Sequence, residues 1–173
     1  MFEKGYLHIY TGNGKGKTTA ALGLILRACG AGLKVYLGQF MKRREHSEVV
    51  ALRRFSDQVT VQQFGSGVFV KGNPSDEDRL KAEEGLALAR QAIFSGNYDL
   101  VVLDEINVAV ANSLIPVGEV LELVTTRPQK VELVLTGRRA HPDLVERADV
   151  VTEMVEIRHY YKNGVKAREG IEK

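Results

Sequence analysis

Apolar residues along this chain form two kinds of pattern, short continuous runs and longer stretches with apolar positions every three or four residues. Short apolar runs are typical of buried strands, and the longer spacing is typical of helices. The short runs predict about six strands, at residues 6–10, 33–40, 59–64, 98–103, 131–135 and 150–157. Helical patterns separate these runs, which favours a three-layer α/β fold with a mostly parallel sheet and helices on both of its faces.

The helical stretches differ in how much of their surface is apolar. Residues 20–29 are apolar almost all round, which predicts a largely buried helix that ends at Gly30 and Gly32. The helix that follows Ser75 has a single apolar stripe, and Asp78 is placed as its capping-box partner. The expected inner positions of that stripe are Ala82, Leu86, Ala89 and Ile93. Further helices are expected at residues 45–55 and 106–115, from Pro116 onward and after Pro142.

The length and composition fit one globular domain that spans residues 1–173. Apolar residues make up 44% of the 173 positions and charged residues 27%, which is ordinary for a globular protein. No repeat or linker divides the chain. Residues 158–173 carry a turn signal at Asn163-Gly164 and are expected to form a C-terminal arm, either extended or folded as a small hairpin. The net charge of +2 gives no general electrostatic case for a nucleic-acid partner.

The single cysteine, Cys29, lies in an apolar helical run, so its expected role is core packing. One cysteine cannot form a disulfide within a chain, which fits a reducing compartment. The sequence shows neither a signal peptide nor an apolar stretch of the roughly 18 residues that would span a membrane. We therefore expect a cytoplasmic protein with no membrane partner.

A glycine-rich segment stands between the first expected strand and the first expected helix. Its residues are Thr11, Gly12, Asn13, Gly14, Lys15, Gly16, Lys17, Thr18 and Thr19. Strand, glycine-rich turn and helix together predict a phosphate-binding loop (P-loop), in which backbone N–H groups and a helix N-terminus surround anionic oxygens. Lys17 would add a mobile ammonium, and the Thr18 hydroxyl is placed to hold a phosphate-bound Mg²⁺. The first glycine of the usual pattern G-x-x-x-x-G-K-S/T falls on Thr11, and a glycine-rich turn that only caps a buried helix is the alternative.

Two carboxylates follow the most apolar of the expected strands. Asp104 and Glu105 come directly after the run at residues 100–103. In a doubly wound sheet, ligands collect at the carboxyl ends of the strands, which places this pair beside the glycine-rich loop. A carboxylate there can hold Mg²⁺ directly or through water, and a solvated acidic turn is the alternative.

Cations and an aromatic loop add further candidates. Arg138 and Arg139 follow the strand at residues 131–135, and at most one of two adjacent side chains is expected to face the site. Lys15 would suit a highly charged polyphosphate unless it points to solvent. The glycine-studded loop at residues 65–74 carries Phe69 at the end of a strand, where loops often bind ligands; a plain connection is the alternative.

Other common catalytic arrangements are not indicated. The four histidines, His8, His46, His141 and His159, have no metal-ligand spacing, and we do not expect a zinc site. The sequence also offers no Ser-His-Asp or Cys-His set. This favours a reaction that needs no general base, although Asp104 or Glu105 could serve as one.

The motifs together resemble those of the ATP:corrinoid adenosyltransferases of cobalamin synthesis and salvage, over nearly the whole chain. The matching segments are Gly12-Asn13-Gly14-Lys15-Gly16-Lys17-Thr18, Val101-Val102-Leu103-Asp104-Glu105-Ile106-Asn107, Leu135-Thr136-Gly137-Arg138, His141-Pro142, Ala148-Asp149-Val150-Val151-Thr152-Glu153-Met154, and the tail with His159, Gly164, Lys166-Ala167 and Gly170-Ile171-Glu172. The resemblance implies a P-loop NTPase-like fold. It also implies a reaction in which Co(I) of a reduced corrinoid attacks the 5′ carbon of ATP and the whole triphosphate leaves.

The resemblance further implies ATP as co-substrate, Mg²⁺ as cofactor and a homodimer, with a flavoprotein reductase as candidate partner. In such a reaction Lys17, Lys15 and Arg138 would stabilise charge on the departing triphosphate, while Thr18, Asp104 and Glu105 would hold Mg²⁺. Residues 12–19 would bind the nucleotide. The family places ATP in its loop in the reverse sense from kinases, with the γ-phosphate deep in the cradle.

The chain departs from the family pattern on the corrinoid side. Many members carry a longer N-terminal segment, and many have a Thr-Trp pair after the Gly-x-Gly of the mid-chain loop. Here Gly65-Ser66-Gly67 is followed by Val68-Phe69-Val70, and the chain has no tryptophan. Phe69 is our candidate for a wall of the corrinoid pocket.

The alternatives to an adenosyltransferase are a motor-like or regulatory P-loop ATPase, a nucleoside or small-molecule kinase, and a non-enzymatic binding module. An acidic strand end is also what an ATPase uses to hold Mg²⁺ and orient water, so that motif does not separate them. The products do, because only adenosyl transfer yields triphosphate and a light-sensitive cobalt–carbon bond.

Overall fold

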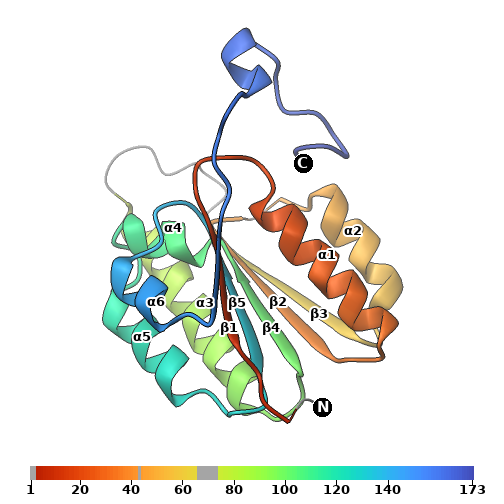
Figure 1. The fold of residues 1–173 in the computed structure, drawn as a ribbon, viewed down its shortest axis with the longest axis vertical. Coiled ribbons are helices and arrows are strands. Elements are labelled where there is room, and N and C mark those ends of the chain that lie inside the picture. Colours follow the sequence, from red (N-terminus) through yellow and green to blue (C-terminus); the bar gives the residue numbers. More distant parts are fainter. Residues whose placement is uncertain (1–2, 43, 66–73) are drawn as a thin grey trace.

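The computed structural model describes residues 3–42, 44–65 and 74–173, and a six-stranded sheet forms its centre (Figure 1). The strands lie in the order β3-β2-β4-β5-β1-β6, and neighbouring strands are parallel throughout. Their bounds are β1 (Leu7–Thr11), β2 (Val35–Phe40), β3 (Val59–Phe64), β4 (Leu100–Asp104), β5 (Glu132–Thr136) and β6 (Val150–Glu153). The predicted parallel α/β sheet is confirmed.

Helices cover both faces of the sheet and give the fold three layers (Figure 1). One face carries α1 (Lys17–Gly30) and α2 (Ser47–Leu52), which is followed by the 3-10 turn η1 (Arg53–Phe55). The other face carries α3 (Asp76–Phe94), α4 (Ile106–Ala111), α5 (Val117–Thr126) and α6 (Pro142–Arg147). The sheet therefore has a hydrophobic cluster on each side.

The central strand β4 contributes to both clusters. Val101 and Leu103 pack on the side of α3 to α6, while Leu100 and Val102 pack on the side of α1 and α2. Successive side chains of a strand point to opposite faces, so a strand covered on both sides needs a continuous apolar run. The run at residues 100–103 meets that need.

Three expectations about the helices are confirmed and one is wrong. Ser75 and Asp78 form the predicted capping box at the start of α3, and the four expected inner positions of that helix are buried. Cys29 is buried in the core beside Ile25. However, α1 buries one face rather than most of its surface, because it lies on the outside of the sheet, and Leu26 is 58% exposed.

Several predicted strand boundaries move by one to four residues. β2 begins at Val35 rather than at residue 33, and β4 begins at Leu100 rather than at residue 98. Just before these two strands, the Lys34 N–H donates to the Asp99 carboxylate at 2.9 Å, so the side chain of Asp99 takes the place of a ladder bond. β6 ends at Glu153 rather than at residue 157, because its partner β1 ends at Thr11, which pairs with Glu153.

Two expected helices are shorter than their apolar patterns indicate. The helix expected at residues 45–55 is the short α2 followed by η1. The helix expected at residues 106–115 ends at Ala111, because Ser113 adopts a left-handed backbone conformation with φ of 56°. The Leu114 N–H then donates to the Ala109 carbonyl at 2.9 Å and closes the end of α4.

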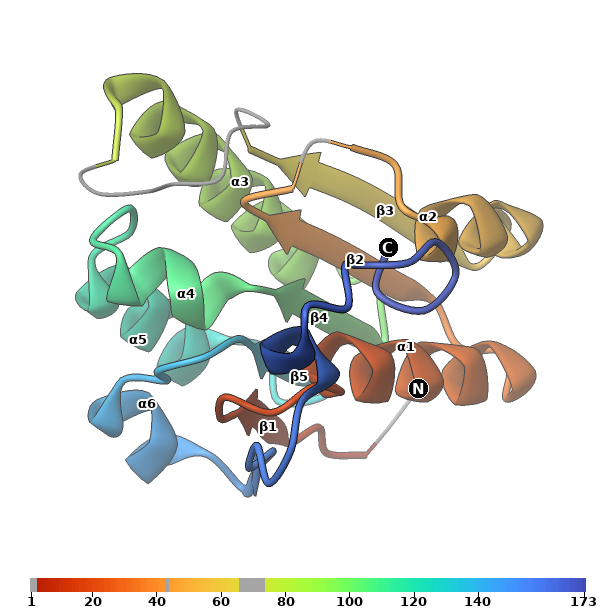
Figure 2. The ribbon, with the colours of Figure 1, turned by 90° about the horizontal axis from the view of Figure 1, so that it is seen from above.

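The C-terminal residues rise from β6 and return over the carboxyl edge of the sheet (Figure 1, Figure 2). They contain the short 3-10 helix η2 (Tyr160–Asn163), and the residue that follows it, Gly164, has a left-handed φ of 81°. The turn signal at Asn163-Gly164 therefore ends a helical turn inside an arm rather than joining two strands of a hairpin. None of the helices in the described part of the chain is long and apolar enough to cross a membrane.

Candidate functional site

The candidate site lies at the carboxyl edge of the sheet, where the loop after β1 leads into α1 (Figure 1, Figure 2). Since every strand is parallel, the ends of β1, β2, β4 and β5 meet at this one edge. Ligands of open α/β sheets bind at this edge. The geometry therefore brings together the loop at residues 12–16, the acidic end of β4 and the turn after β5.

The end of β6 holds the glycine-rich loop in place. The Gly14 N–H donates to the Met154 carbonyl at 2.6 Å, and Gly12 has φ of 92°, which few side chains tolerate. A Cβ added at Gly12 would lie 2.5 Å from the Met154 carbonyl oxygen, and one at Gly14 would lie 2.6 Å from it. Glycines at these positions thus allow the backbone at Met154 to come close to the loop, and they also keep the loop open for a ligand.

Lys17 lies within the loop. Its Nζ donates to the Gly12 and Gly14 carbonyl oxygens, each at 2.7 Å, and the residue is only 7% exposed. Burial lowers the pKa of the Lys17 ammonium, and the nearby Arg138 guanidinium lowers it further, against the opposing effect of Glu105 and Asp104. A phosphate group that entered the loop would therefore meet a positive charge.

The Asp104 carboxylate accepts four hydrogen bonds from side chains of the site. It is fully buried, and its Oδ1 accepts from the hydroxyls of Thr18 at 2.8 Å and Thr136 at 2.7 Å. Its Oδ2 accepts from Lys42 Nζ at 2.8 Å and from Gln39 Nε2 at 3.2 Å. Burial alone would raise the pKa of Asp104, but Lys42 and the two hydroxyls outweigh it, so the pKa lies below its ordinary value. Asp104 is therefore an ionised carboxylate next to the loop.

Glu105 differs from its neighbour Asp104 in backbone conformation and in the direction of its pKa shift. It has a left-handed φ of 63°, and its N–H donates to the Thr136 hydroxyl at 3.0 Å. Burial raises the pKa of Glu105, and the Asp104 carboxylate raises it further, while Lys42, Lys17 and Arg138 oppose the rise. The Glu105 side chain thus lies among three cations of the site.

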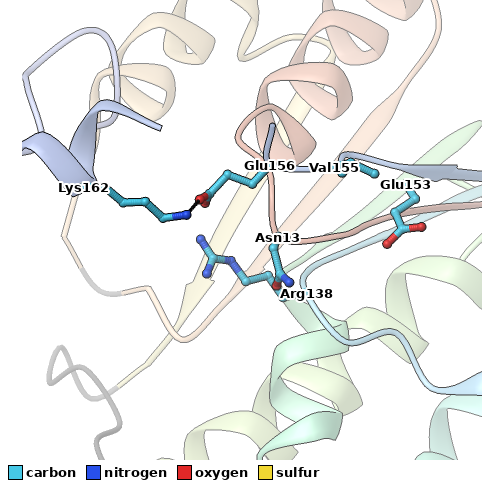
Figure 3. A pocket seen from close by; sticks show the side chains of 6 residues that line it. All are labelled: Asn13, Arg138, Glu153, Val155, Glu156 and Lys162. Carbon is cyan, nitrogen blue, oxygen red and sulfur yellow. Dashed lines mark ion pairs between the residues drawn. The ribbon is translucent and has the colours of Figure 1, made fainter. Parts of the chain in front are cut away.

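The two adjacent arginines point in different directions, as their adjacency predicts. Arg139 has a left-handed φ of 57°, and its Nη2 donates to Asn112 Oδ1 at 2.7 Å, away from the loop. Arg138 instead faces a cavity of about 440 Å³ (Figure 3). The residues that line this cavity are Asn13, Arg138, Glu153, Val155, Glu156 and Lys162. In Figure 3 the guanidinium of Arg138 points toward the ion pair of Glu156 and Lys162, whose charged atoms lie 2.5 Å apart.

The remaining predicted site residues are Lys15, Thr19 and Phe69. Lys15 points to the C-terminal arm rather than into the loop, with Nζ 2.8 Å from both Glu172 Oε1 and the Ile171 carbonyl oxygen. The hydrogen bond to Glu172 raises the pKa of Lys15. Thr19 is exposed on the first turn of α1. Phe69 lies outside the described residues.

Several polar side chains around Asp104 were missed by the sequence reasoning. Gln39, Lys42 and Thr136 each donate to Asp104, and Glu48 accepts from Gln39 and Lys42. Gln39 carried a usable signal, because it is a polar residue near the carboxyl end of an otherwise apolar strand and is fully buried. Lys42 and Glu48 lie beyond the strand, where the sequence gives no sign of which way a side chain turns.

Known proteins resemble this chain over nearly its whole length. A family model described as ATP:corrinoid adenosyltransferase BtuR/CobO/CobP matches residues 3–172. The corrinoid adenosyltransferase of Pseudomonas aeruginosa is 38% identical over 171 residues, which cover 98% of this chain and 84% of that protein. The corrinoid adenosyltransferase of Escherichia coli K12 is 35% identical over 171 residues, covering 98% and 86%. Corrinoid adenosyltransferase CobA of Salmonella typhimurium is 34% identical over 173 residues, with the same coverage of 98% and 86%.

Among solved structures, the KaiC-like protein PH0186 from Pyrococcus horikoshii OT3 is similar to this chain with a TM-score of 0.57. The likeness covers 88% of this chain and 74% of that one, at 19% sequence identity. At this identity the likeness concerns the fold alone.

Proposed function

This chain belongs to the ATP:corrinoid adenosyltransferase family of cobalamin metabolism, and we propose that it carries out adenosyl transfer at the carboxyl edge of its sheet, with the triphosphate of ATP in the loop at residues 12–19. The observation that carries this proposal is the match of the family model over residues 3–172. The fold and the buried Lys17 support the placement of the phosphates.

The reaction forms one bond and breaks one. The nucleophile is Co(I) of the reduced corrinoid, which gives an electron pair to the 5′ carbon of the ribose. The bond from that carbon to the α-phosphate oxygen breaks, and the triphosphate leaves with the bonding electrons. Co(I) carries no proton, so the step requires no general base. The rate then depends on aligning cobalt with carbon and on stabilising the leaving group.

The residues of this chain act chiefly on the leaving group. Lys17 already lies among the loop carbonyls and is the first candidate to neutralise the triphosphate. Arg138 faces the neighbouring cavity and is the second. Lys15 can join them if it leaves Glu172. Backbone N–H groups of the loop and of the first turn of α1 add fixed partial charges.

The orientation that we propose for ATP is the one that the resemblance to the family implies, and it agrees with the chemistry. A kinase presents its γ-phosphate to an acceptor, whereas this reaction must present the 5′ carbon. We therefore place the γ-phosphate deep in the loop beside Lys17 and the ribose farther out, the reverse of the sense in kinases.

The end of β4 suits a phosphate-bound Mg²⁺. The Thr18 hydroxyl and the Asp104 carboxylate lie 2.8 Å apart and are hard oxygen ligands of the kind that Mg²⁺ prefers. A cationic group, the Lys42 ammonium, already contacts this carboxylate, so the site accepts positive charge. Thr18, Asp104 and Glu105 would hold the ion. When bound, Mg²⁺ supplies positive charge to the phosphate oxygens of the leaving group.

The remaining expectations stay proposals. We place Phe69 in the wall of the corrinoid pocket, and we propose a cytoplasmic homodimer that receives Co(I) corrinoid through a flavoprotein reductase. We also propose that residues 1–173 form one domain, with residues 158–173 as its arm. The contacts of the arm with Lys15 support a single domain that includes the arm.

The decisive experiment supplies ATP, Mg²⁺ and chemically reduced cobalamin without oxygen and follows the absorption spectrum. We expect the spectrum of a cobalt–carbon bond, its loss on illumination, and triphosphate as the second product. Lys17→Ala serves as the matched control. The formation of ADP with no alkylated cobalt would instead identify an ATPase or a kinase.

A further inference from the structure

Lys42 occupies an unusual position between two carboxylates from different elements. Its Nζ lies 2.8 Å from Asp104 Oδ2, at the end of β4, and 3.4 Å from Glu48 Oε1, in the first turn of α2. Asp104 is fully buried, and the side chains of Lys42 and Glu48 are 17% and 16% exposed. The ammonium therefore sits in a nearly closed space with a strong partner on one side and a weaker one on the other.

Gln39 helps to hold the two carboxylates in place. Its Nε2 lies 3.2 Å from Asp104 Oδ2 and 3.3 Å from Glu48 Oε1, so the amide donates toward the same two oxygens as the ammonium. Its Oε1 accepts from Gln63 Nε2 at 2.9 Å, which keeps the donor side of the amide turned to the carboxylates. One oxygen of Asp104 and one of Glu48 thus both face the position of the Lys42 ammonium.

The same Asp104 is needed for a second cation. In the function proposed above, on which this inference rests, Asp104 and Thr18 hold the Mg²⁺ of the nucleotide. Thr18 contacts Asp104 Oδ1 and Lys42 contacts Oδ2, so Mg²⁺ and the ammonium would face each other across one carboxylate and repel strongly. This repulsion favours movement of Lys42 away from Asp104 when magnesium binds, and Glu48 is the partner already within reach.

We propose that Lys42 is a positioning residue that exchanges with Mg²⁺ at Asp104. In the nucleotide-free enzyme the ammonium compensates the buried Asp104 carboxylate, and on binding of the magnesium nucleotide it shifts onto Glu48. The exchange keeps the end of β4 neutralised in both states, since an uncompensated buried carboxylate would destabilise the protein. It also makes Glu48 the residue that sets how readily Lys42 leaves.

Substitution of Lys42 and substitution of Glu48 should change Mn²⁺ binding in opposite directions. Lys42→Met removes the competing cation, so we expect nucleotide-free enzyme to bind Mn²⁺, a spectroscopic substitute for Mg²⁺, at least about tenfold more tightly. Glu48→Gln removes the place to which Lys42 retreats, so we expect Mn²⁺ binding to weaken about threefold or more. General damage to the site would weaken binding in both variants.

The measurement is the electron paramagnetic resonance signal of free Mn²⁺ in titrations of the full chain without nucleotide. Lys81→Met and Glu84→Gln are matched controls, because they make the same charge changes in the exposed pair of α3, whose charged atoms are 2.7 Å apart. If Lys42→Met loses the fold, the Glu48→Gln titration still decides. Unchanged Mn²⁺ binding in Glu48→Gln, or weaker binding in folded Lys42→Met, overturns the exchange. The wild-type cobalamin assay tests the proposed function separately, because an enzyme without the exchange would still alkylate cobalt.

Discussion

Lys15 and Glu172 form an ion pair at 2.8 Å across 157 positions of sequence, so the last residues of the chain lie on the phosphate loop. Other contacts hold the arm in this place. Arg168 and the Tyr160 hydroxyl also bind the Glu172 carboxylate, and the Ser47 hydroxyl donates to the Lys173 carbonyl oxygen at 3.1 Å. The arm thereby neutralises a loop cation that the triphosphate could otherwise use.

Releasing Lys15 should strengthen nucleotide binding. In Glu172→Gln the ammonium loses its ion pair, and we expect the Kd for ATP to fall about two- to fivefold, the range that an exposed ion pair supports. Isothermal titration with ATP measures it, with Glu84→Gln as a control for removal of a surface carboxylate. A rise in Kd would mean that the arm holds Lys15 in position for ATP rather than withholding it.

Lys17→Ala should separate chemistry from corrinoid binding. The ammonium lies inside the loop, where it donates to the Gly12 and Gly14 carbonyl oxygens, so its loss should remove stabilisation of the leaving triphosphate. We expect kcat to fall by about 10²-fold or more, in the range found when one charge-stabilising donor is removed. The Kd for corrinoid, measured by its absorption change, should stay within about twofold. Equal losses in both quantities would contradict this division of labour.

The fold could be predicted from the sequence because its signals are local. The apolar run at residues 100–103 indicates a strand buried on both faces, and the glycine-rich segment indicates a phosphate loop between β1 and α1. Helix α1 shows the limit of this reasoning. An apolar pattern all round does not reveal that one side of the helix has no covering layer, so Leu26 is exposed where burial was expected.

The site could be predicted in part, for a similar reason. Lys17, Thr18 and Asp104 come from motifs whose spacing fixes their backbone, and the structure brings all three together. The contact between Lys15 and Glu172 joins opposite ends of the chain. The position of Lys42 depends on where the chain turns after β2. Neither can be read from a local pattern, because both depend on how distant segments pack.

The opposite orientations of Arg138 and Arg139 give a matched pair of variants. Arg138 faces the cavity beside the loop, whereas Arg139 bonds to Asn112. We expect Arg138→Ala to lower kcat about 10- to 100-fold, because a charged donor to the leaving group is lost, and Arg139→Ala to stay within about threefold. Steady-state kinetics with reduced cobalamin measure both. Similar losses in the two variants would remove Arg138 from the triphosphate site.

Two glycines near the loop should respond to alanine in opposite ways. Gly12 has φ of 92°, and a Cβ there would lie 2.5 Å from the Met154 carbonyl oxygen, so Gly12→Ala combines backbone strain with a clash against the end of β6. We expect it to lower the free energy of unfolding by about 2 kcal/mol or more. Gly23 lies within α1, and a Cβ there would meet nothing within 4 Å. Gly23→Ala should therefore raise the free energy of unfolding by about 0.5–1 kcal/mol, the usual gain of alanine over glycine in a helix. Urea unfolding followed by far-ultraviolet circular dichroism measures both. A Gly12→Ala protein as stable as the wild type would show that the loop can leave Met154, and the cradle would then owe its shape to the bound phosphates rather than to β6.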